Sequence, residues 1–276
     1  MVGRDRLTAL VGEDNVAGYQ RDGVGVLRGL FAGDWLDALR DGVERNLAEP
    51  GPYAGEHAEG QGRFFDDYCN WERIPEYRAF VYESPAAAVA AAVMQSPGAQ
   101  LFHEHVLVKE PGAAKRTPWH QDALYYCVDG RQTVTFWIPL DPVPRDICPE
   151  FIAGSHRWGK LFYPRRFADD TDYAYDGGGF ETIPSIDRER EKYDIRSYEL
   201  APGDVILFHF RTVHGAPANP GAGRRRGFAP RWLGEDARFV ERPGRTSPPY
   251  PGIGQKTGER LREDWFPVIW PPGEGD

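Results

Sequence analysis

The sequence predicts a mainly β fold with flanking α-helices, of the jelly-roll or double-stranded β-helix type. Helical signals are concentrated in the first hundred residues. From residue 100 onward, short runs rich in β-branched and aromatic residues alternate with Gly and Pro, a pattern typical of sandwiches and jelly rolls. A chain of 276 residues with 41% hydrophobic residues suits one large domain with a packed core.

Two helices are expected in the N-terminal part. One covers residues 34–40, where apolar side chains recur at helical spacing after Asp34 as the capping residue. The other covers 84–94, where a serine cap and a proline at the first helical position precede an alanine-rich body. The polar, glycine-rich stretch 51–60 is expected to be a loop.

Five strands are expected in the second part, each bounded by turn residues. They cover residues 101–109, 133–140, 150–153, 204–210 and 225–232. We expect a single domain over 1–276, divided into helical support (1–99), a jelly-roll core (100–235), a lid insertion (157–198) and a C-terminal extension (236–276). The insertion is long for a connection within a compact domain, and such loops often cover active sites.

Charge and cysteine content narrow the class of protein. The formal net charge of −9 argues against binding to a nucleic-acid backbone. The three cysteines are an odd number without a CxxC pair, which indicates neither a disulfide framework nor a zinc site and favours a reducing, cytoplasmic location. No signal-peptide core and no apolar run of the roughly 20 residues of a membrane span are present, so a membrane association is not expected.

The segment around Trp119 contains the strongest chemical signal. His120 and Asp122 are two positions apart, so in an extended strand both side chains lie on the same face. His214, after an apolar strand and before a glycine, is the best candidate for a third ligand. Two histidines and one carboxylate are the ligand set of non-haem iron(II) oxygenases. A His-x-Asp pair alone recurs by chance, so the pair needs further support.

That support comes from an arginine eleven residues after His214. Arg225 could bind the far end of a dicarboxylate co-substrate, because a guanidinium offers a planar pair of donors. Its neighbours Arg224 and Arg226 are expected to be part of a solvated basic turn.

With these motifs in order, the chain resembles the phytanoyl-CoA dioxygenase-like branch of the 2-oxoglutarate oxygenases, which includes ectoine hydroxylases and many natural-product enzymes. The resemblance covers most of the chain. It rests on six segments: Asp22-Gly-Val-Gly-Val-Leu, Val108-Lys-Glu-Pro-Gly, Trp119-His-Gln-Asp, Trp137-Ile-Pro-Leu-Asp, Glu150-Phe-Ile-Ala-Gly-Ser-His, and His214-Gly followed by Arg225.

The resemblance implies a role for each matching residue. His120, Asp122 and His214 match the iron ligands, and Arg225 matches the residue that binds the distal carboxylate of 2-oxoglutarate. The implied cofactor is Fe(II), with 2-oxoglutarate and O2 as co-substrates.

Three further residues match positions close to the co-substrate in the family. Lys109 matches a lysine near the co-substrate or substrate, while His105 and Trp137 match positions that contact 2-oxoglutarate. One departure is the stretch 146–150, which stands where the family usually carries Asn-Gly and a small or apolar residue. His156, at the end of this element, is expected to be structural.

The predicted function is an Fe(II)- and 2-oxoglutarate-dependent dioxygenase that hydroxylates an unactivated C–H bond, with desaturation, epoxidation or cyclisation as other outcomes. Asp122 argues against halogenation, because halogenases of this class carry a small residue there. The Ala-, Arg-, Gly- and Pro-rich composition favours a bacterial natural-product enzyme acting on a small or medium molecule. Candidate substrate contacts are Tyr125, Tyr126, Phe162, Tyr163, Arg165, Arg166, Tyr173, Tyr175 and Arg231.

Two alternatives stay open. His103, His105 and Glu110 resemble the His-x-His…Glu ligand set of cupins, although the glycines that flank that motif are missing. A non-catalytic jelly roll that only binds a ligand or a metal is the other. We expect a small molecule as the only kind of partner, and a monomer or a homodimer.

Overall fold

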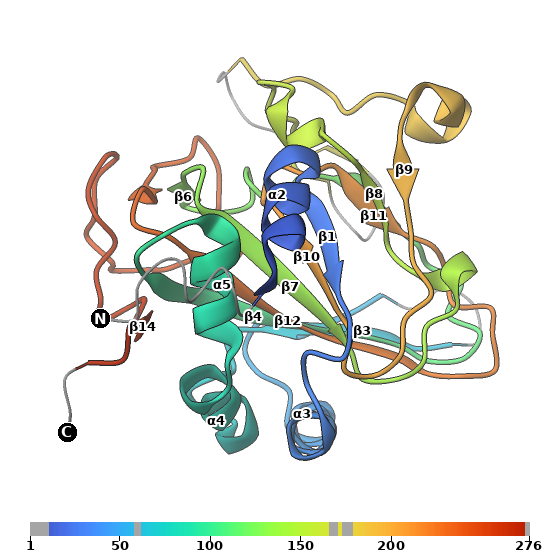
Figure 1. Ribbon diagram of the computed structural model, residues 1–276. Coiled ribbons are helices and arrows are strands. Elements are labelled where there is room, and N and C mark those ends of the chain that lie inside the picture. The colour runs from blue at the N-terminus through green and yellow to red at the C-terminus, as the bar shows by residue number, and fades with distance from the viewer. Residues whose placement is uncertain (1–10, 58–61, 166–170, 173–178, 274–276) are drawn as a thin grey trace.

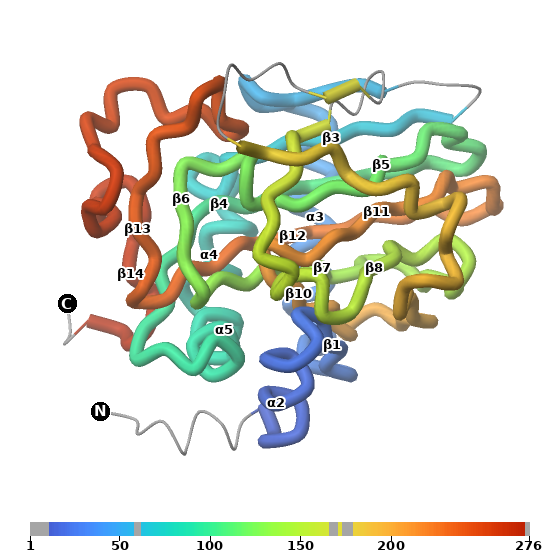
Figure 2. Tube along the Cα trace, turned by 90° about the horizontal axis from the view of Figure 1, so that it is seen from above, coloured from blue at the N-terminus to red at the C-terminus, as the bar shows by residue number. Residues whose placement is uncertain are grey.

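The computed structural model describes residues 11–57, 62–165, 171–172 and 179–273. Its core is a large antiparallel sheet that packs against a smaller one (Figure 1). Figure 2 looks through the smaller sheet onto strands of the large sheet behind it. The mainly β, jelly-roll fold predicted from the sequence is confirmed.

The large sheet has eight strands. Their order is β1 (Val24–Leu27), β10 (Val205–Phe208), β7 (Thr133–Pro139), β12 (Arg225–Leu233), β4 (Ala99–Lys109), β3 (Phe64–Tyr68) and β2 (Gly55–Glu56), with β14 (Val268–Trp270) also paired to β4. The smaller sheet has the order β5 (Thr117–His120), β11 (His214–Ala216), β8 (Glu150–Ile152) and β9 (Ile195–Arg196). A separate pair joins β6 (Val128–Asp129) to β13 (Arg238–Phe239).

Helices cover the outer side of the large sheet (Figure 1). They are α2 (Glu13–Asp22), α3 (Gly33–Ala48), α4 (Pro75–Glu83) and α5 (Ala86–Met94). Short 3-10 helices lie in the connections of the second half: η1 (Arg145–Ile147), η2 (Ser155–Arg157), η3 (Ile186–Arg188) and η4 (Arg190–Lys192).

The two predicted helices are present as α3 and α5, but both caps differ from the prediction. Asp34 lies within the first turn of α3 and Ala32 is the cap, with no side-chain hydrogen bond to the helix end. A carboxylate in that position still interacts favourably with the helix dipole. In α5 the cap is Pro85 and the helix starts at Ala86, so Ser84 lies one residue before the cap, although its hydroxyl accepts a hydrogen bond from the Ala86 amide at 3.3 Å.

The first hundred residues also supply strands that the sequence did not predict. β1, β2 and β3 all belong to the large sheet, and β3 pairs with β4 along its whole length. The division of the chain at residue 99 stays a prediction. In the part of the chain that the structure describes, no helix has both the length and the apolarity to cross a lipid bilayer.

Alternation along β4 and β12 separates the core from the site. Val106, Val108 and Phe228 point outward into the cluster that packs under the helices. The residues between them point to the opposite face, toward the smaller sheet, because successive side chains of a strand alternate. This inner face contains His103, His105, Leu107 and Lys109 from β4, and Arg225, Gly227, Ala229 and Arg231 from β12.

Candidate active site

Three predicted ligands converge where β5 and β11 meet in the smaller sheet. His120 ends β5 and pairs with His214, the first residue of β11. Asp122 lies just past β5, and its Oδ1 is 3.5 Å from His120 Nε2 and 3.7 Å from His214 Nε2. All three side chains are buried. Among the described residues, they form the one group of His, Cys, Asp and Glu with the spacing of a metal site.

Backbone carbonyls fix the orientation of both imidazoles. His120 Nδ1 lies 2.8 Å from the Pro118 carbonyl, and His214 Nδ1 lies 2.9 Å from the Thr212 carbonyl. Since a carbonyl can only accept, each Nδ1 carries a hydrogen, and each Nε2 is the ring nitrogen that faces Asp122. Burial lowers the pKa of His214 to about 3, which keeps the ring neutral as a metal ligand must be.

The two oxygens of Asp122 have different surroundings. While Oδ1 faces both imidazoles, Oδ2 lies 3.4 Å from Thr135 Oγ1 and 3.7 Å from Arg231 Nη2. Burial alone would raise the pKa of the Asp122 carboxyl, but Arg231 and the two histidines outweigh it and hold this pKa well below its usual range. Two imidazoles and one ionised carboxylate on one side fit a non-haem iron ion with open positions.

A cavity of about 390 Å³ opens beside these three side chains. Both sheets contribute to its wall, together with the loops after β2, after β5 and near residue 247. Half of the described residues that line it are aromatic or histidine: Tyr53, His57, Tyr68, His103, His105, His120, Tyr125, Tyr126, Trp137, Phe151, Phe208 and His214. Asp66, Asp122, Arg165, Arg231 and Ser247 are among the others.

Arg225 and Lys109 lie next to this cavity rather than in its wall. They are register partners on β12 and β4, and both are buried. The Arg225 guanidinium donates to the carbonyls of Ile147 and Pro217. The Lys109 ammonium donates to the carbonyls of Lys115 and Pro217, at 2.8 and 3.1 Å. Among the described residues, no carboxylate pairs with either cation.

Burial changes the acidity of both cations. It lowers the pKa of Arg225 to about 10. The pKa of Lys109 falls to about 6, first through burial and then through the charges of Arg225 and Lys115. Two buried cations without a counter-charge are costly unless a ligand supplies one.

The other two predicted co-substrate contacts, His105 and Trp137, line the cavity. Trp137 lies directly over Gly227, where an added Cβ would be 2.6 Å from the indole Nε1. His105 Nε2 hydrogen-bonds Asp66 Oδ2 at 2.8 Å, and its Nδ1 is 3.4 Å from Arg231 Nη2. Their contact with 2-oxoglutarate stays a prediction.

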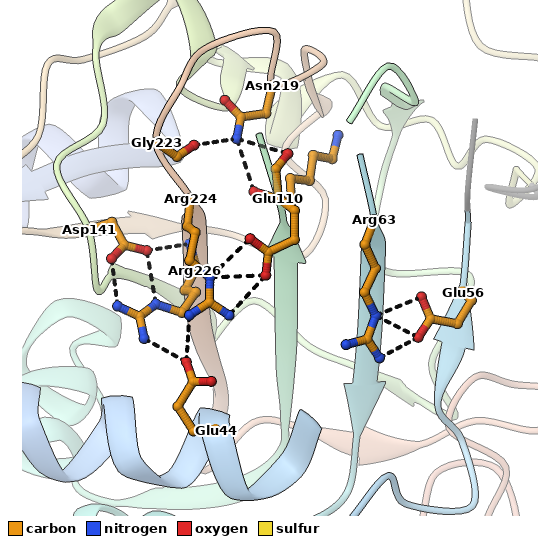
Figure 3. A network of polar contacts seen from close by, with 10 residues as sticks. Glu44, Glu56, Arg63, Glu110, Asp141, Asn219, Gly223, Arg224 and Arg226 are labelled. Carbon is orange, nitrogen blue, oxygen red and sulfur yellow. Dashed lines mark hydrogen bonds and ion pairs between the residues drawn. The ribbon is translucent and has the colours of Figure 1, made fainter. Parts of the chain in front are cut away.

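Arg224 and Arg226 do not form the solvated turn that was expected. Figure 3 shows both on the outer face of β12, within a network of carboxylates. Arg224 pairs with Glu110 and with Glu44 of α3, at 2.9 and 2.7 Å. Arg226, whose side chain is 12% exposed, makes two hydrogen bonds to Asp141 and one to Glu44. Arg226 lies within β12, and Arg224 immediately precedes its first residue, Arg225.

The cupin-like alternative does not assemble. His103 and His105 point into the cavity, but Glu110 lies at the outer network with Arg224. Of the predicted substrate contacts, Tyr125, Tyr126, Arg165 and Arg231 line the cavity, whereas Phe162 is buried in a separate apolar cluster. Arg166, Tyr173 and Tyr175 lie outside the described residues.

The sequence analysis missed Asp66 and His57. Asp66 lies between His57 and His105, with Oδ1 2.5 Å from His57 Nε2. The stretch 64–68, Phe-Phe-Asp-Asp-Tyr, alternates apolar and acidic residues only in part. The preceding residues 51–60 are expected to be a loop. Its pairing with β4 decides that it is a strand, and that pairing is not visible in the local pattern.

Comparison with solved structures supports the fold. The structure is similar to SnoN, the non-heme alpha ketoglutarate dependent epimerase from nogalamycin biosynthesis, with a TM-score of 0.73 and 23% identity over 95% of this chain and 99% of that chain. SnoK, the carbocyclase of the same biosynthesis, gives 0.70 and 23% over 94% and 96%. EctD from S. alaskensis gives 0.64 and 18% over 82% and 78%. No curated protein sequence matches the chain.

A family model identifies the class directly. The model of phytanoyl-CoA dioxygenase (PhyH) matches residues 19–227, well over half of the chain, and this range includes every predicted ligand. The match confirms the resemblance inferred from the motifs, and with it the enzyme class: a 2-oxoglutarate-dependent non-haem iron dioxygenase with Fe(II), 2-oxoglutarate and O2. This chain belongs to the phytanoyl-CoA dioxygenase family.

Proposed function

We propose that this protein hydroxylates a C–H bond of a small or medium organic molecule in bacterial natural-product biosynthesis. One observation carries the proposal: the His120, Asp122 and His214 group and the unpaired cations Arg225 and Lys109 lie beside the same cavity. A metal site alone would serve many functions. A metal site with a nearby cationic anchor suits a chelating dicarboxylate.

His120, Asp122 and His214 would hold the iron through Nε2, Oδ1 and Nε2. When bound there, iron and 2-oxoglutarate would supply the oxidising power for the C–H bond, with O2 and 2-oxoglutarate consumed and succinate and CO2 released as one oxygen atom enters the substrate. The protein contributes ligand orientation through the carbonyls of Pro118 and Thr212. It also contributes a cavity beside the metal ligands in which a substrate can lie.

Arg225 would bind the distal carboxylate of 2-oxoglutarate. Its present acceptors are two backbone carbonyls, which are neutral and weaker partners than a carboxylate. Lys109, which shares the Pro217 carbonyl with Arg225, would add a second donor to the same anion. Trp137 and Pro149 line the cavity close to these groups, where the body of the co-substrate would lie.

The choice of reaction rests on Asp122 and on the relatives. A carboxylate at this position occupies the site that a halide would need, so halogenation is not proposed. SnoK and SnoN are a carbocyclase and an epimerase of one natural-product pathway, which supports the biosynthetic setting and keeps ring closure as a second outcome of the same chemistry. A small-molecule partner, a monomer or homodimer, and a cytoplasmic location stay predictions.

The test is formation of succinate from 2-oxoglutarate by the Fe(II)-loaded protein in air. Asp122→Ala and His214→Ala are expected to lower this rate at least 100-fold, because each removes a ligand. His156→Ala is the matched control, since this half-buried histidine lies outside the cavity and should keep the wild-type rate. Full turnover by either ligand variant would refute the assignment of the site.

A further inference from the structure

One wall of the cavity is built from polar side chains that the iron site does not use. His103 and His105 come from β4, Asp66 from β3, and His57 follows β2. In the register of β4 with β12, His103 pairs with Arg231, six positions along β12 from Arg225. His103 therefore lies away from the co-substrate anchor, whereas Asp66 pairs with Leu107, two residues from Lys109. We call these four residues the histidine wall.

His103 lines the cavity, and its ring contains a buried acceptor that has no partner among the described residues. The side chain is buried, at 2% exposure, and its Nδ1 lies 3.0 Å from the Glu104 carbonyl. Nδ1 therefore carries the hydrogen, and Nε2 carries a lone pair. Burial lowers the pKa of His103 well below its usual range, which keeps the ring neutral. No described residue donates to Nε2, and a buried acceptor without a partner is costly.

Asp66 positions the remainder of the wall. Its two carboxylate oxygens accept from His57 Nε2 at 2.5 Å and from His105 Nε2 at 2.8 Å. Burial would raise the pKa of Asp66, but the two histidines together lower it, so the carboxylate stays ionised. Because both oxygens are occupied, Asp66 acts as a positioning residue that fixes two imidazole planes and not as a ligand for a cation.

A glycine makes this close pairing possible. Gly55 lies opposite Asp66 in the β2–β3 pair. A Cβ at this position would be 2.6 Å from Asp66 Oδ1 and 3.0 Å from His57 Nε2, distances at which the pair must move. Gly55 also lines the cavity, so the wall can be disturbed there without removal of a polar group.

Charge and size restrict what can bind against this wall. Of the described lining residues, only Arg165 and Arg231 have guanidinium or ammonium groups. Arg231 is already engaged, 2.5 Å from Tyr126 Oη and 3.7 Å from Asp122 Oδ2. A coenzyme A thioester carries several phosphate charges that need such groups. A cavity of about 390 Å³ is near the lower end of small-molecule sites and would not enclose it.

The cavity surface next to the histidine wall is flat and aromatic. Tyr53 and Tyr68 stack with ring centroids 5.0 Å apart and an angle of 6° between their planes. The Tyr68 ring also contacts His103 and His105 edge-on, at 6.1 and 5.5 Å. Such surfaces favour ring systems over flexible chains.

We propose that the histidine wall is the substrate-recognition site, and that the substrate is an uncharged ring compound with a free hydroxyl group that donates a hydrogen bond to His103 Nε2. The inference rests on the proposed function, because it names the substrate class of that same site. His103 is then a specificity residue, and Asp66, with His57 and His105, holds the surface against which the ring lies.

The test measures binding to the protein loaded with Fe(II) and 2-oxoglutarate under anaerobic conditions. The probes are neutral phenols and aryl glycosides, the same compounds with the hydroxyl methylated, carboxylate-bearing analogues, and acyl-CoA thioesters. We expect the neutral hydroxyl compounds to bind best, and methylation of the decisive hydroxyl to weaken binding about tenfold. In His103→Phe this difference between alcohol and ether should disappear, and in His103→Gln, which keeps an acceptor, it should be partly restored.

Gly55→Ala gives a second, independent measurement. The added methyl should raise the Kd of the neutral compounds several-fold through displacement of Asp66, while the Kd of 2-oxoglutarate changes less than twofold. His156→Phe, outside the cavity, should change neither value.

The proposal is overturned if alcohol and ether bind wild-type protein equally well, if carboxylates or thioesters bind better, or if neutral compounds show no preference. Failure of the proposed function would look different. In that case the protein would not bind 2-oxoglutarate in a metal-dependent way, whichever probe was added.

Discussion

Near the start of β12, the arginines on the two faces of the strand have different kinds of partner. On the outer face, Arg224 and Arg226 meet carboxylates from α3 and from the ends of β4 and β7 (Figure 3). On the inner face, Arg225 donates to backbone carbonyls and lies beside a second cation, Lys109. The outer arginines are matched within the chain, and the inner one is not.

Under the proposed function, the difference separates charges that stabilise the fold from a charge that would bind a ligand. Partly exposed ion pairs add little to stability, and a network of them mainly fixes how α3 lies against the sheet. A buried cation without a counter-ion lowers stability, and an enzyme retains it where a substrate anion completes the pair. Position within one tripeptide thus decides the role of each arginine, because strand alternation sends Arg225 to the side of the metal site.

Replacement of Arg225 should have the largest effect on 2-oxoglutarate binding. Arg225→Gln is expected to raise the Kd of 2-oxoglutarate about 100-fold, because hydrogen bonds to a charged group are worth roughly 1.5–3 kcal/mol each and two are available. Arg224→Gln, one residue away on the outer face, is the matched control and should change this Kd less than threefold. Calorimetric titration with 2-oxoglutarate measures both. Equal effects of the two variants would contradict the assignment of the faces.

Replacement of Lys109 should have a smaller effect at the same site. Lys109→Met keeps the length of the side chain and its contact with the Phe64 ring, 4.5 Å from the ammonium, but removes the donor. We expect the Kd of 2-oxoglutarate to rise about tenfold at pH 6.5, since one charge-assisted hydrogen bond is lost. A Kd within twofold of wild type would mean that Lys109 donates to the carbonyls of Lys115 and Pro217 but does not bind 2-oxoglutarate.

The pH dependence of binding should be smaller again. The Lys109 pKa of about 6 lies below its ordinary value, and the charged groups that face it are Arg225 and Lys115. An arriving carboxylate favours the ammonium, so binding takes up a proton and affinity falls as pH rises above about 6. Between pH 6.5 and 8.5 we expect a several-fold rise in Kd for wild type and a flat profile for Lys109→Met. A wild-type profile as flat as that of the variant would show that Lys109 does not titrate here.

The sequence predicts the residues of the metal site better than it predicts the helices and strands around them. His120, Asp122 and His214 converge as predicted, although Asp122 lies in a bend just past β5 and not in the strand. The helices also follow from local patterns, with α2 and α4 missed.

Long-range pairing accounts for what the sequence could not show. β3 is short and acidic, and only its register with β4 brings Asp66 between His57 and His105. In the same way, the acids that pair with Arg224 and Arg226 come from residues as far away as Glu44. Neither arrangement has a signature in the neighbouring residues, so a basic turn and a polar loop were the expected structures.

Replacement of Arg226, on the outer face, should have the smallest effect. Arg226→Gln removes a bidentate pair with Asp141 and a contact with Glu44, at a site that is only partly buried. We expect the free energy of unfolding to fall by about 1 kcal/mol, at the upper end for exposed pairs, and the Kd of 2-oxoglutarate to stay unchanged. Chemical denaturation and calorimetric titration of the same preparation measure the two quantities. A loss of 2-oxoglutarate binding without a loss of stability would show that the outer network orients Arg225, and the two faces would then act as one unit.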